Sequence, residues 1–323
     1  MRDHAGRLMT PRHCFGPVLS RRLGLSLGID LVPFKYCSYN CAYCECGPTT
    51  HRTVTRQAFF PADDVISELR TVLATRPYLD SITLAGSGEP TLSLVIGDVI
   101  RQVKTEFPEY TVSVLTNGSL LTDPDVRAAL LRADRVIPTL TSASQKTFKR
   151  IHRPHLSLRI YDIIEGMVQF RKMYSGALWL EVFVIPGVNT TEGELAGLRE
   201  AIDRIQPDQV QLNTLDRPPA EEWVKAATDT ELERVYDVLG MTGVEIVGSR
   251  HPLSRATRAM TDDTDLIRAT LCRRPSTVED LVLTTGRSGS EIVKCLGMLE
   301  RNGEVTSRRG TRGVFYAIFA GQK

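Results

Sequence analysis

The sequence predicts an α/β fold, a partial (β/α)6 barrel joined to a C-terminal winged helix-turn-helix. Two observations predict this class. From about residue 23 to residue 248, strand-like stretches alternate with helix-like stretches about six times, which is typical of a parallel sheet with crossover helices. From residue 262 onward the pattern changes to three short helical stretches followed by two strands.

The predicted strands are short apolar runs that end in polar or glycine-containing turns. They are expected at residues 28–33, 80–85, 110–115, 135–140, 178–185, 209–213 and 244–247. Helices are predicted where apolar residues recur at helical spacing, as from Val65 to Leu73, or where a cap such as Asp123-Pro124 begins one. They are expected at residues 62–75, 95–103, 124–131, 160–174, 191–205 and 220–239. Parallel strands carry chemistry at their carboxyl ends, so the polar turns should converge on one rim.

The chain is predicted to divide into four segments. They are an N-terminal extension (1–22), the barrel (23–248), a linker (249–261) and the winged helix-turn-helix (262–323). The linker is polar and basic and lacks apolar periodicity. In the last segment, helices are expected at 265–271, 277–284 and 289–302, and strands at 304–307 and 314–319.

The composition is that of a folded protein, with 323 residues, of which 42% are hydrophobic. Forty basic and 38 acidic residues give a net charge of +2, so total charge does not argue for a polyanionic partner. No apolar run approaches the ~20 residues needed to span a bilayer, and the N-terminus lacks the apolar stretch of a secretory signal. We therefore expect a cytoplasmic protein with no membrane contact.

The chain has 7 cysteines, and four of them crowd into one loop. Cys37, Cys41 and Cys44 are spaced C-x3-C-x2-C. Thiolates are soft ligands that suit zinc or an iron–sulfur cluster. One interpretation is a closed zinc site with Cys46 or His51 as its fourth ligand. The other is a cluster of four irons in which one iron keeps an open position.

This loop resembles the cluster-binding signature of radical S-adenosylmethionine (radical SAM) enzymes, including the aromatic Tyr43 before the third cysteine. The resemblance implies a [4Fe-4S] cluster on Cys37, Cys41 and Cys44, with S-adenosylmethionine (SAM) on the fourth iron. It also implies a reductant of the flavodoxin or ferredoxin type. Residues 15–30 resemble the opening of a subgroup of Fe–S oxidoreductases, itself similar to wyosine-forming and molybdopterin-synthesis enzymes.

A second motif, Ser87-Gly88-Glu89-Pro90, follows the second predicted strand and resembles the family's Gly-Gly-Glu-Pro element. The resemblance implies that these residues orient the methionine end of SAM. Glycine permits a close backbone approach, and the Glu89 carboxylate suits an ammonium group. The alternative, a dinucleotide-binding turn, lacks its third glycine and would place Glu89 against a pyrophosphate.

Four further residues are candidate SAM contacts because they lie at or near the ends of later strands. They are Asn117, Thr139, Ser142 and Glu181. The stretch 139–144 resembles a Ser-Leu-Asp-Ser element, although threonines replace its serine and aspartate. Glu181 lies within an apolar strand, so its carboxylate either points into the barrel mouth or is paired.

The resemblance predicts an enzyme that reductively cleaves SAM to a 5′-deoxyadenosyl radical and modifies an unidentified substrate. We expect a macromolecular substrate such as tRNA or another nucleic acid, because the C-terminal hairpin carries Arg308, Arg309 and Arg312. One alternative is a peptide- or protein-modifying enzyme that uses the winged helix for docking. The other is a DNA-binding sensor that responds to its cluster or to SAM.

Overall fold

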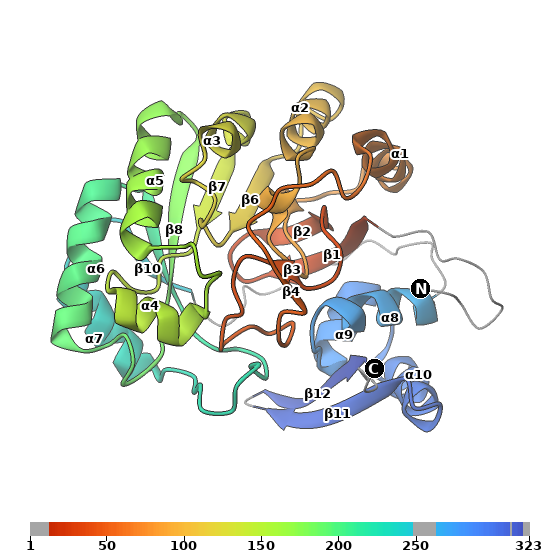
Figure 1. Ribbon diagram of the computed structural model, residues 1–323. Helices are drawn as coiled ribbons and strands as arrows, with labels where there is room; N and C mark the ends of the chain where they lie inside the picture. The colour runs from red at the N-terminus through yellow and green to blue at the C-terminus, as the bar shows by residue number, and fades with distance from the viewer. Residues whose placement is uncertain (1–12, 248–262, 311, 319–323) are drawn as a thin grey trace.

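The computed structural model describes residues 13–247, 263–310 and 312–318. A curved eight-stranded sheet in the order β1-β2-β5-β6-β7-β8-β9-β10 forms its centre (Figure 1). Strands β2 to β10 are parallel, and β1 runs antiparallel to β2 at one edge. The strands are β1 (Cys14–Ser20), β2 (Gly24–Ile29), β5 (Ser81–Leu84), β6 (Val112–Thr116), β7 (Arg135–Pro138), β8 (Ala177–Phe183), β9 (Gln209–Asn213) and β10 (Val244–Ile246).

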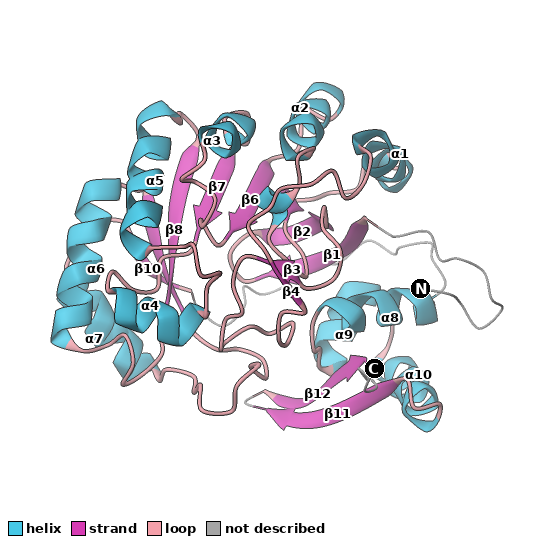
Figure 2. Ribbon diagram, viewed as in Figure 1, coloured by secondary structure: helices cyan, strands magenta, loops and turns pink. Residues whose placement is uncertain are grey.

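Helices follow the parallel strands and lie around the outside of the sheet (Figure 2). They are α1 (Ala62–Leu73), α2 (Ile96–Glu106), α3 (Pro124–Leu130), α5 (Ile160–Met173), α6 (Glu192–Ile205) and α7 (Asp229–Leu239). Each of the sheet strands β2, β5, β6, β7, β8 and β9 is thus followed along the chain by a helix before the next sheet strand, which confirms the predicted partial (β/α)6 barrel, with β10 as an added strand.

The two faces of the sheet differ in chemistry because side chains alternate along a strand. On the outer face, Val112 and Val114 of β6 pack into the main hydrophobic core together with helix residues such as Leu69. On the inner face, hydroxyls form a buried ladder, in which Ser81 Oγ donates to Ser113 Oγ at 2.9 Å. The interior of the barrel is therefore lined in part by polar groups.

Several local features differ from the sequence-based expectation. The first barrel strand was expected at residues 28–33, but β2 runs from Gly24 to Ile29. Strand β1 lies inside the predicted N-terminal extension, where the Gly16-Pro17 pair interrupts the apolar alternation. Helix α4 (Gln145–His152) was not predicted. The helix predicted from residue 220 begins only at Asp229, because Thr228 forms a capping box that fixes the start of α7.

The C-terminal segment contains α8 (Asp263–Arg273), α9 (Val278–Thr285) and α10 (Gly289–Arg301), followed by an antiparallel hairpin of β11 (Val305–Gly310) and β12 (Gly313–Ile318). These elements occur in the predicted order and share a small core around Leu281 and Leu296. Helices α8 and α9 contact β1. The predicted linker at 249–261 lies outside the described residues.

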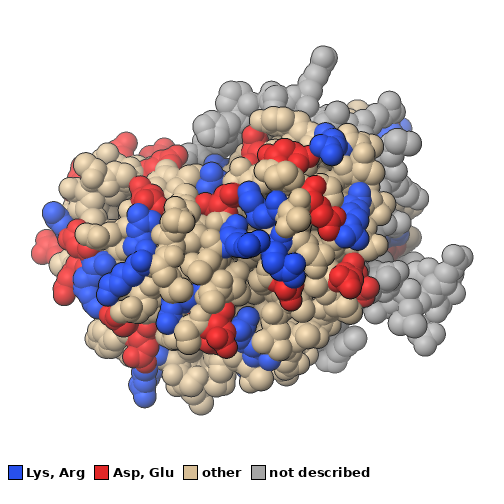
Figure 3. All heavy atoms as spheres, turned by 90° about the horizontal axis from the view of Figure 1, so that it is seen from above, with Lys and Arg blue, Asp and Glu red and all other residues tan. Residues whose placement is uncertain are grey.

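None of the described helices is long and apolar enough to cross a membrane. Figure 3 shows the molecule from above, with Lys and Arg side chains interspersed with Asp and Glu. This mixture agrees with the near-neutral net charge of +2.

Candidate active site

The cysteine loop joins β2 to α1 at the carboxyl end of β2. A short parallel ladder of β3 (Tyr36–Cys37) and β4 (His51–Arg52) closes its base. The loop is also held by the end of α4, since Asn40 N donates to His152 O at 2.9 Å and Ala42 N donates to Ile151 O at 2.8 Å. The last carbonyls of a helix have no partner within the helix, so the loop satisfies them while being fixed in place.

Each of the three motif thiols has a different nitrogen neighbour. Lys35 Nζ donates to Cys44 Sγ at 3.1 Å. Asn117 Nδ2 donates to Cys37 Sγ at 3.6 Å, and His152 Nδ1 lies 3.2 Å from Cys41 Sγ. Hydrogen bonds to sulfur are a main way in which proteins tune iron–sulfur clusters. The donor set therefore fits an anionic [4Fe-4S] cluster held by three thiolates.

Burial dominates the ionisation of this site. It raises the pKa of Cys37 to about 12 and raises the pKa of Cys41 as well. Cys44 differs, because the Cys46 side chain and the Lys35 ammonium outweigh burial and lower its pKa. Burial also lowers the pKa of His152 to about 3, so its imidazole is neutral at physiological pH.

The structure does not favour the zinc interpretation. Cys46 Sγ donates to the carbonyl oxygen of Arg273 at 2.9 Å, and the His51 ring stacks on Tyr36 at 4.3 Å. Among the described residues, no three His, Cys, Asp or Glu side chains are placed to hold a single metal ion. In a four-iron cluster each thiolate binds a separate iron, so the cluster interpretation does not require that single-ion geometry.

The second motif lies against the cysteine loop. Glu89 N donates to Tyr36 O at 2.9 Å, and a Cβ atom at Gly88 would lie 2.1 Å from the same oxygen. Glycine is therefore required by the close approach of two backbones. Ser87 is tied to the end of β2, since its N and Oγ donate to Asp30 Oδ2 at 3.1 Å and 3.0 Å.

The Glu89 carboxylate is buried and accepts hydrogen bonds from three surrounding residues. Its Oε1 accepts from Thr91 N at 3.0 Å, from Thr91 Oγ1 and from Thr116 Oγ1, and its Oε2 accepts from Asn117 N at 2.7 Å. Burial raises the pKa of Glu89, and it outweighs these hydrogen bonds, which act to lower that pKa. In this structure the carboxylate joins the ends of β5 and β6 and positions Asn117 beside Cys37.

Glu181 is paired with neighbouring polar side chains, which is one of the two interpretations left open by the sequence. Arg22 NH1 lies 2.9 Å from its Oε1, Asn213 Nδ2 donates to Oε1 at 2.8 Å, and Thr139 Oγ1 donates to Oε2 at 2.8 Å. Burial opposes ionisation, but these neighbours outweigh it and lower the pKa of Glu181. Arg21 extends the network by donating to Asn213 Oδ1 at 3.0 Å.

Two other predicted residues occupy different surroundings. Tyr43 stacks on Phe183, with ring centroids 4.1 Å apart, and borders the ring of His152. Ser142 is buried, and its hydroxyl donates to Glu194 Oε2 at 2.8 Å, beside the N-terminus of α4. Ser142 therefore belongs to the packing of α4 on α6, and its hydroxyl is engaged there.

Sequence reasoning missed Lys35 and His152 as neighbours of the thiols. His152 falls in the basic stretch 149–155, where no helix was predicted. The apolar spacing of Phe148 and Ile151, both buried on one side of α4, was the signal that could have revealed the helix and its buried end. For Lys35, a single lysine beside the loop carried no such pattern.

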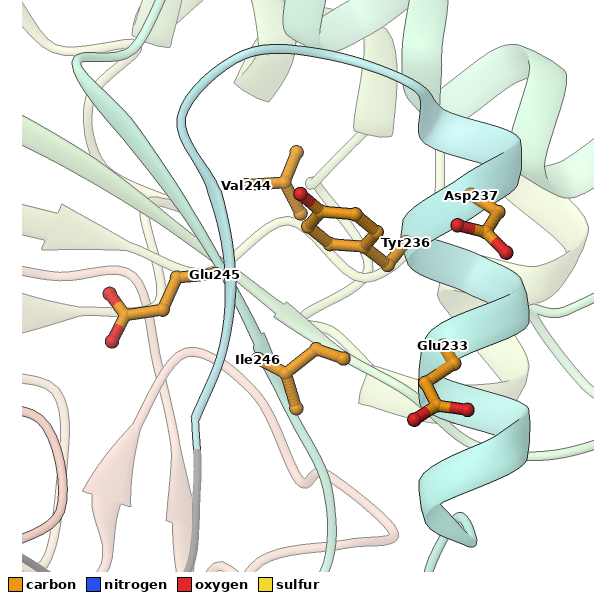
Figure 4. Close-up of a pocket in the computed structure, with 6 residues that line it drawn as sticks. All are labelled: Glu233, Tyr236, Asp237, Val244, Glu245 and Ile246. Atoms are coloured by element: carbon orange, nitrogen blue, oxygen red, sulfur yellow. The ribbon is translucent and has the colours of Figure 1, made fainter.

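A surface hollow of about 430 Å³ lies between α7 and β10, far along the sheet order from the cysteine loop. Figure 4 shows Glu233, Tyr236 and Asp237 projecting from α7 and Val244 and Ile246 from β10. It contains none of the predicted site residues.

Residues 31–198 match the Radical SAM superfamily. A protein named GTPase Obg from Brachyspira hyodysenteriae is 34% identical over 315 residues, covering 97% of this chain and 46% of that protein. The chain thus spans about half the length of that relative. A UPF0026 protein of Helicobacter pylori strain 26695 is 32% identical over 313 residues, covering 96% of this chain and 98% of that protein.

Two solved structures share the barrel fold. Streptococcus suis SuiB bound to the precursor peptide SuiA aligns with a TM-score of 0.53 and 14% identity, covering 68% of this chain and 48% of that chain. TYW1 with a lysine–pyruvate adduct aligns with a TM-score of 0.50 and 14% identity, covering 70% of this chain and 75% of that chain. At these identities the likeness supports the fold alone.

The chain therefore belongs to the radical SAM superfamily, and the Helicobacter relative places it among the UPF0026 proteins, whose name states no activity. Members of the superfamily use a [4Fe-4S] cluster and SAM, which confirms the predicted family and its cofactors.

Proposed function

We propose that this protein is a radical SAM enzyme whose [4Fe-4S] cluster is held by Cys37, Cys41 and Cys44. The observation that carries the proposal is the set of three half-buried cysteines in one loop, each with its thiol beside a separate nitrogen, at the carboxyl ends of the parallel strands. When bound, the cluster supplies one electron that splits SAM into methionine and a 5′-deoxyadenosyl radical, which abstracts hydrogen from a substrate.

The chain's own residues position SAM. The backbone at Gly88 and Glu89 lies against Tyr36, next to the first cysteine, where it can meet the amino and carboxylate groups of the methionine moiety. The Glu89 carboxylate acts by fixing this backbone and Asn117. Ser87 contributes by tying the turn to Asp30.

The polar network around Glu181 forms the next part of the proposed site. Thr139, Glu181 and Arg22 lie on or beside the inner face of the sheet, where the ribose of SAM or a polar group of the substrate would reach them. Tyr43, stacked on Phe183, provides an apolar surface beside the cysteines. Of the predicted SAM contacts, Ser142 has the least structural support, because its hydroxyl already donates a hydrogen bond to Glu194.

The chain is proposed to fold as a barrel followed by a C-terminal winged helix, with β1 assigned to the barrel.

The substrate is proposed to be macromolecular. Of the three hairpin arginines, Arg312 pairs with Asp216 and Arg308 lies 3.2 Å from Glu222, so barrel carboxylates neutralise part of the charge that nucleic acid would use. Nucleic acid captured with an inactive Cys37→Ala protein would support a tRNA-like substrate, and captured peptide would support the peptide-docking alternative.

The test is anaerobic reconstitution with iron and sulfide, followed by SAM and dithionite or a flavodoxin- or ferredoxin-type reductant. We expect about four irons per chain and formation of 5′-deoxyadenosine. Alanine at Cys37, Cys41 or Cys44 should abolish both, whereas Cys295→Ala, in the C-terminal core region, should abolish neither. A colourless zinc protein would overturn the proposal. A stable cluster with SAM-dependent DNA binding and no 5′-deoxyadenosine would replace it with the sensor function.

A further inference from the structure

Lys35 is an unusual residue of the cysteine loop because it is a lysine with only 2% of its surface exposed. Its backbone adopts a left-handed conformation with φ of 61°, which L-residues other than glycine rarely do. The peptide is held there, since His51 N donates to Lys35 O at 3.2 Å. The side chain is buried, and its Nζ reaches Cys44 Sγ at 3.1 Å.

Among the residues that the structure describes, no carboxylate lies within ion-pair distance of Lys35 Nζ, and its hydrogen bond goes to Cys44 Sγ at 3.1 Å. A buried charge without a counter-charge is costly. The Cys44 sulfur is therefore the group that balances the Lys35 ammonium, and it carries negative charge when it binds a metal cluster.

The other two nitrogens beside the thiols differ in kind from Lys35. Asn117 carries an uncharged amide, and His152 places its ring nitrogen Nδ1 3.2 Å from Cys41 Sγ. Lys35 brings an ammonium group to the third thiol. A cluster with three thiolates is anionic, and reduction adds a further negative charge to it. A nearby cation in a low-dielectric site stabilises the reduced form more than the oxidised form.

We propose that Lys35 is the built-in counter-charge of the cluster and sets its reduction potential. This inference rests on the proposed function, because it takes Cys44 to be a cluster ligand. Lys35 acts through that ligand and is a positioning and tuning residue. Its role is to raise the reduction potential of the cluster, so that a flavodoxin- or ferredoxin-type reductant can transfer an electron to it.

The test compares reduction potentials of the reconstituted full-length protein, measured without SAM by redox titration of the EPR signal of the reduced cluster. Lys35→Met removes the charge and keeps a similar volume, and Lys35→Arg keeps the charge. Lys172→Met, at an exposed position of α5, removes an equal charge elsewhere. We expect Lys35→Met to lower the equilibrium constant for reduction at least about tenfold, a shift of about 59 mV to more negative potential. Lys35→Arg and Lys172→Met should stay close to the unmodified protein.

An unchanged potential in Lys35→Met would overturn the inference. An equal fall in Lys35→Met and Lys35→Arg would also overturn it, because the effect would then come from shape. Iron content is measured in parallel. Loss of the cluster in Lys35→Met with retention in Lys35→Arg supports the role of charge, and equal loss in both contradicts it. If the unmodified protein binds no cluster, the proposed function itself fails, which is a distinct outcome.

Discussion

Arg312 of the C-terminal hairpin forms a hydrogen-bonded ion pair with Asp216 of the barrel, with Arg312 NH2 donating to Asp216 Oδ2 at 2.8 Å. The pair belongs to a charged network in which Arg217 lies 3.0 Å from Glu45 and 3.8 Å from Asp280. Glu45 directly follows Cys44, so the network joins the C-terminal segment to the loop that carries the motif cysteines. The bond from Cys46 Sγ to the Arg273 carbonyl makes a second connection.

This network predicts that Arg312→Met loosens the C-terminal segment. The side chains of Arg312 and Asp216 are 24% and 12% exposed, so the loss should cost about 2 kcal/mol. Hydrogen–deuterium exchange should rise in the cysteine loop and in α9. Arg308→Met is the matched control, because Arg308 and Glu222 are 55% and 86% exposed and such pairs contribute little. Equal exchange in the two variants would contradict the network's role.

Gly88→Ala should weaken the contact between the two motifs. The added methyl group would lie 2.1 Å from Tyr36 O, and relieving this overlap should cost about 1–3 kcal/mol and lower cluster content. Gly193→Ala in α6 is the control, since nothing lies within 4 Å of its position, and it should be neutral or stabilise by up to about 1 kcal/mol. Thermal unfolding and iron analysis measure both effects. Normal cluster content in Gly88→Ala would show that the close approach is not needed.

Arg22→Met should lower stability in a pH-dependent way. Arg22 and its neighbours lower the pKa of Glu181, so the pair stabilises the folded state when Glu181 is ionised. That contribution is present above the ordinary value of 4.5 and is lost as the pH falls through the lowered pKa of the folded protein. At neutral pH the substitution should cost about 3 kcal/mol.

The same measurement separates this pair from a surface pair. Arg101→Met breaks an exposed pair with Asp98 and should cost less than about 1 kcal/mol at neutral pH. Urea unfolding of both variants, followed from neutral pH to below pH 4.5, tests the assignment. A penalty for Arg22→Met that does not shrink at acidic pH would mean that Glu181 is not the partner that matters.

Ser142→Ala should change stability without changing SAM binding. The Ser142 hydroxyl is buried and donates to Glu194 Oε2, so its removal should cost about 1–2 kcal/mol. Calorimetric titration of the reconstituted protein should give the same SAM affinity as the unmodified protein. A tenfold weaker affinity of Ser142→Ala for SAM would show that Ser142 contributes to SAM binding.

The sequence allowed the prediction of features that depend on contiguous residues. Cys37, Cys41 and Cys44 lie in one loop, and Gly88 and Glu89 follow one strand, so each set forms a short contiguous motif that could be compared with the motifs of a known family. The alternation of strands and helices likewise predicted the barrel. Strand β1 was missed because Gly16-Pro17 breaks its pattern, and its residues are mostly only partly buried.

Features that depend on distant contacts could not be predicted. His152 lies 111 positions from Cys41 and reaches it only because the end of α4 accepts hydrogen bonds from the cysteine loop. Ser142 follows a strand, as a ligand contact would, but Glu194, 52 positions away, engages it. A lone lysine is ordinarily exposed, so the sequence carried no sign that Lys35 is buried with its Nζ beside Cys44 Sγ.

In the proposed enzyme, three cysteines hold the cluster and leave one iron for SAM. This arrangement is tested most directly by electron–nuclear double resonance on the reduced, reconstituted protein with SAM labelled with ¹⁵N at its amino group. We predict a ¹⁵N hyperfine coupling that appears when labelled SAM is added and is absent with unlabelled SAM. A reduced cluster whose spectrum shows no ¹⁵N coupling when labelled SAM is present would contradict the account.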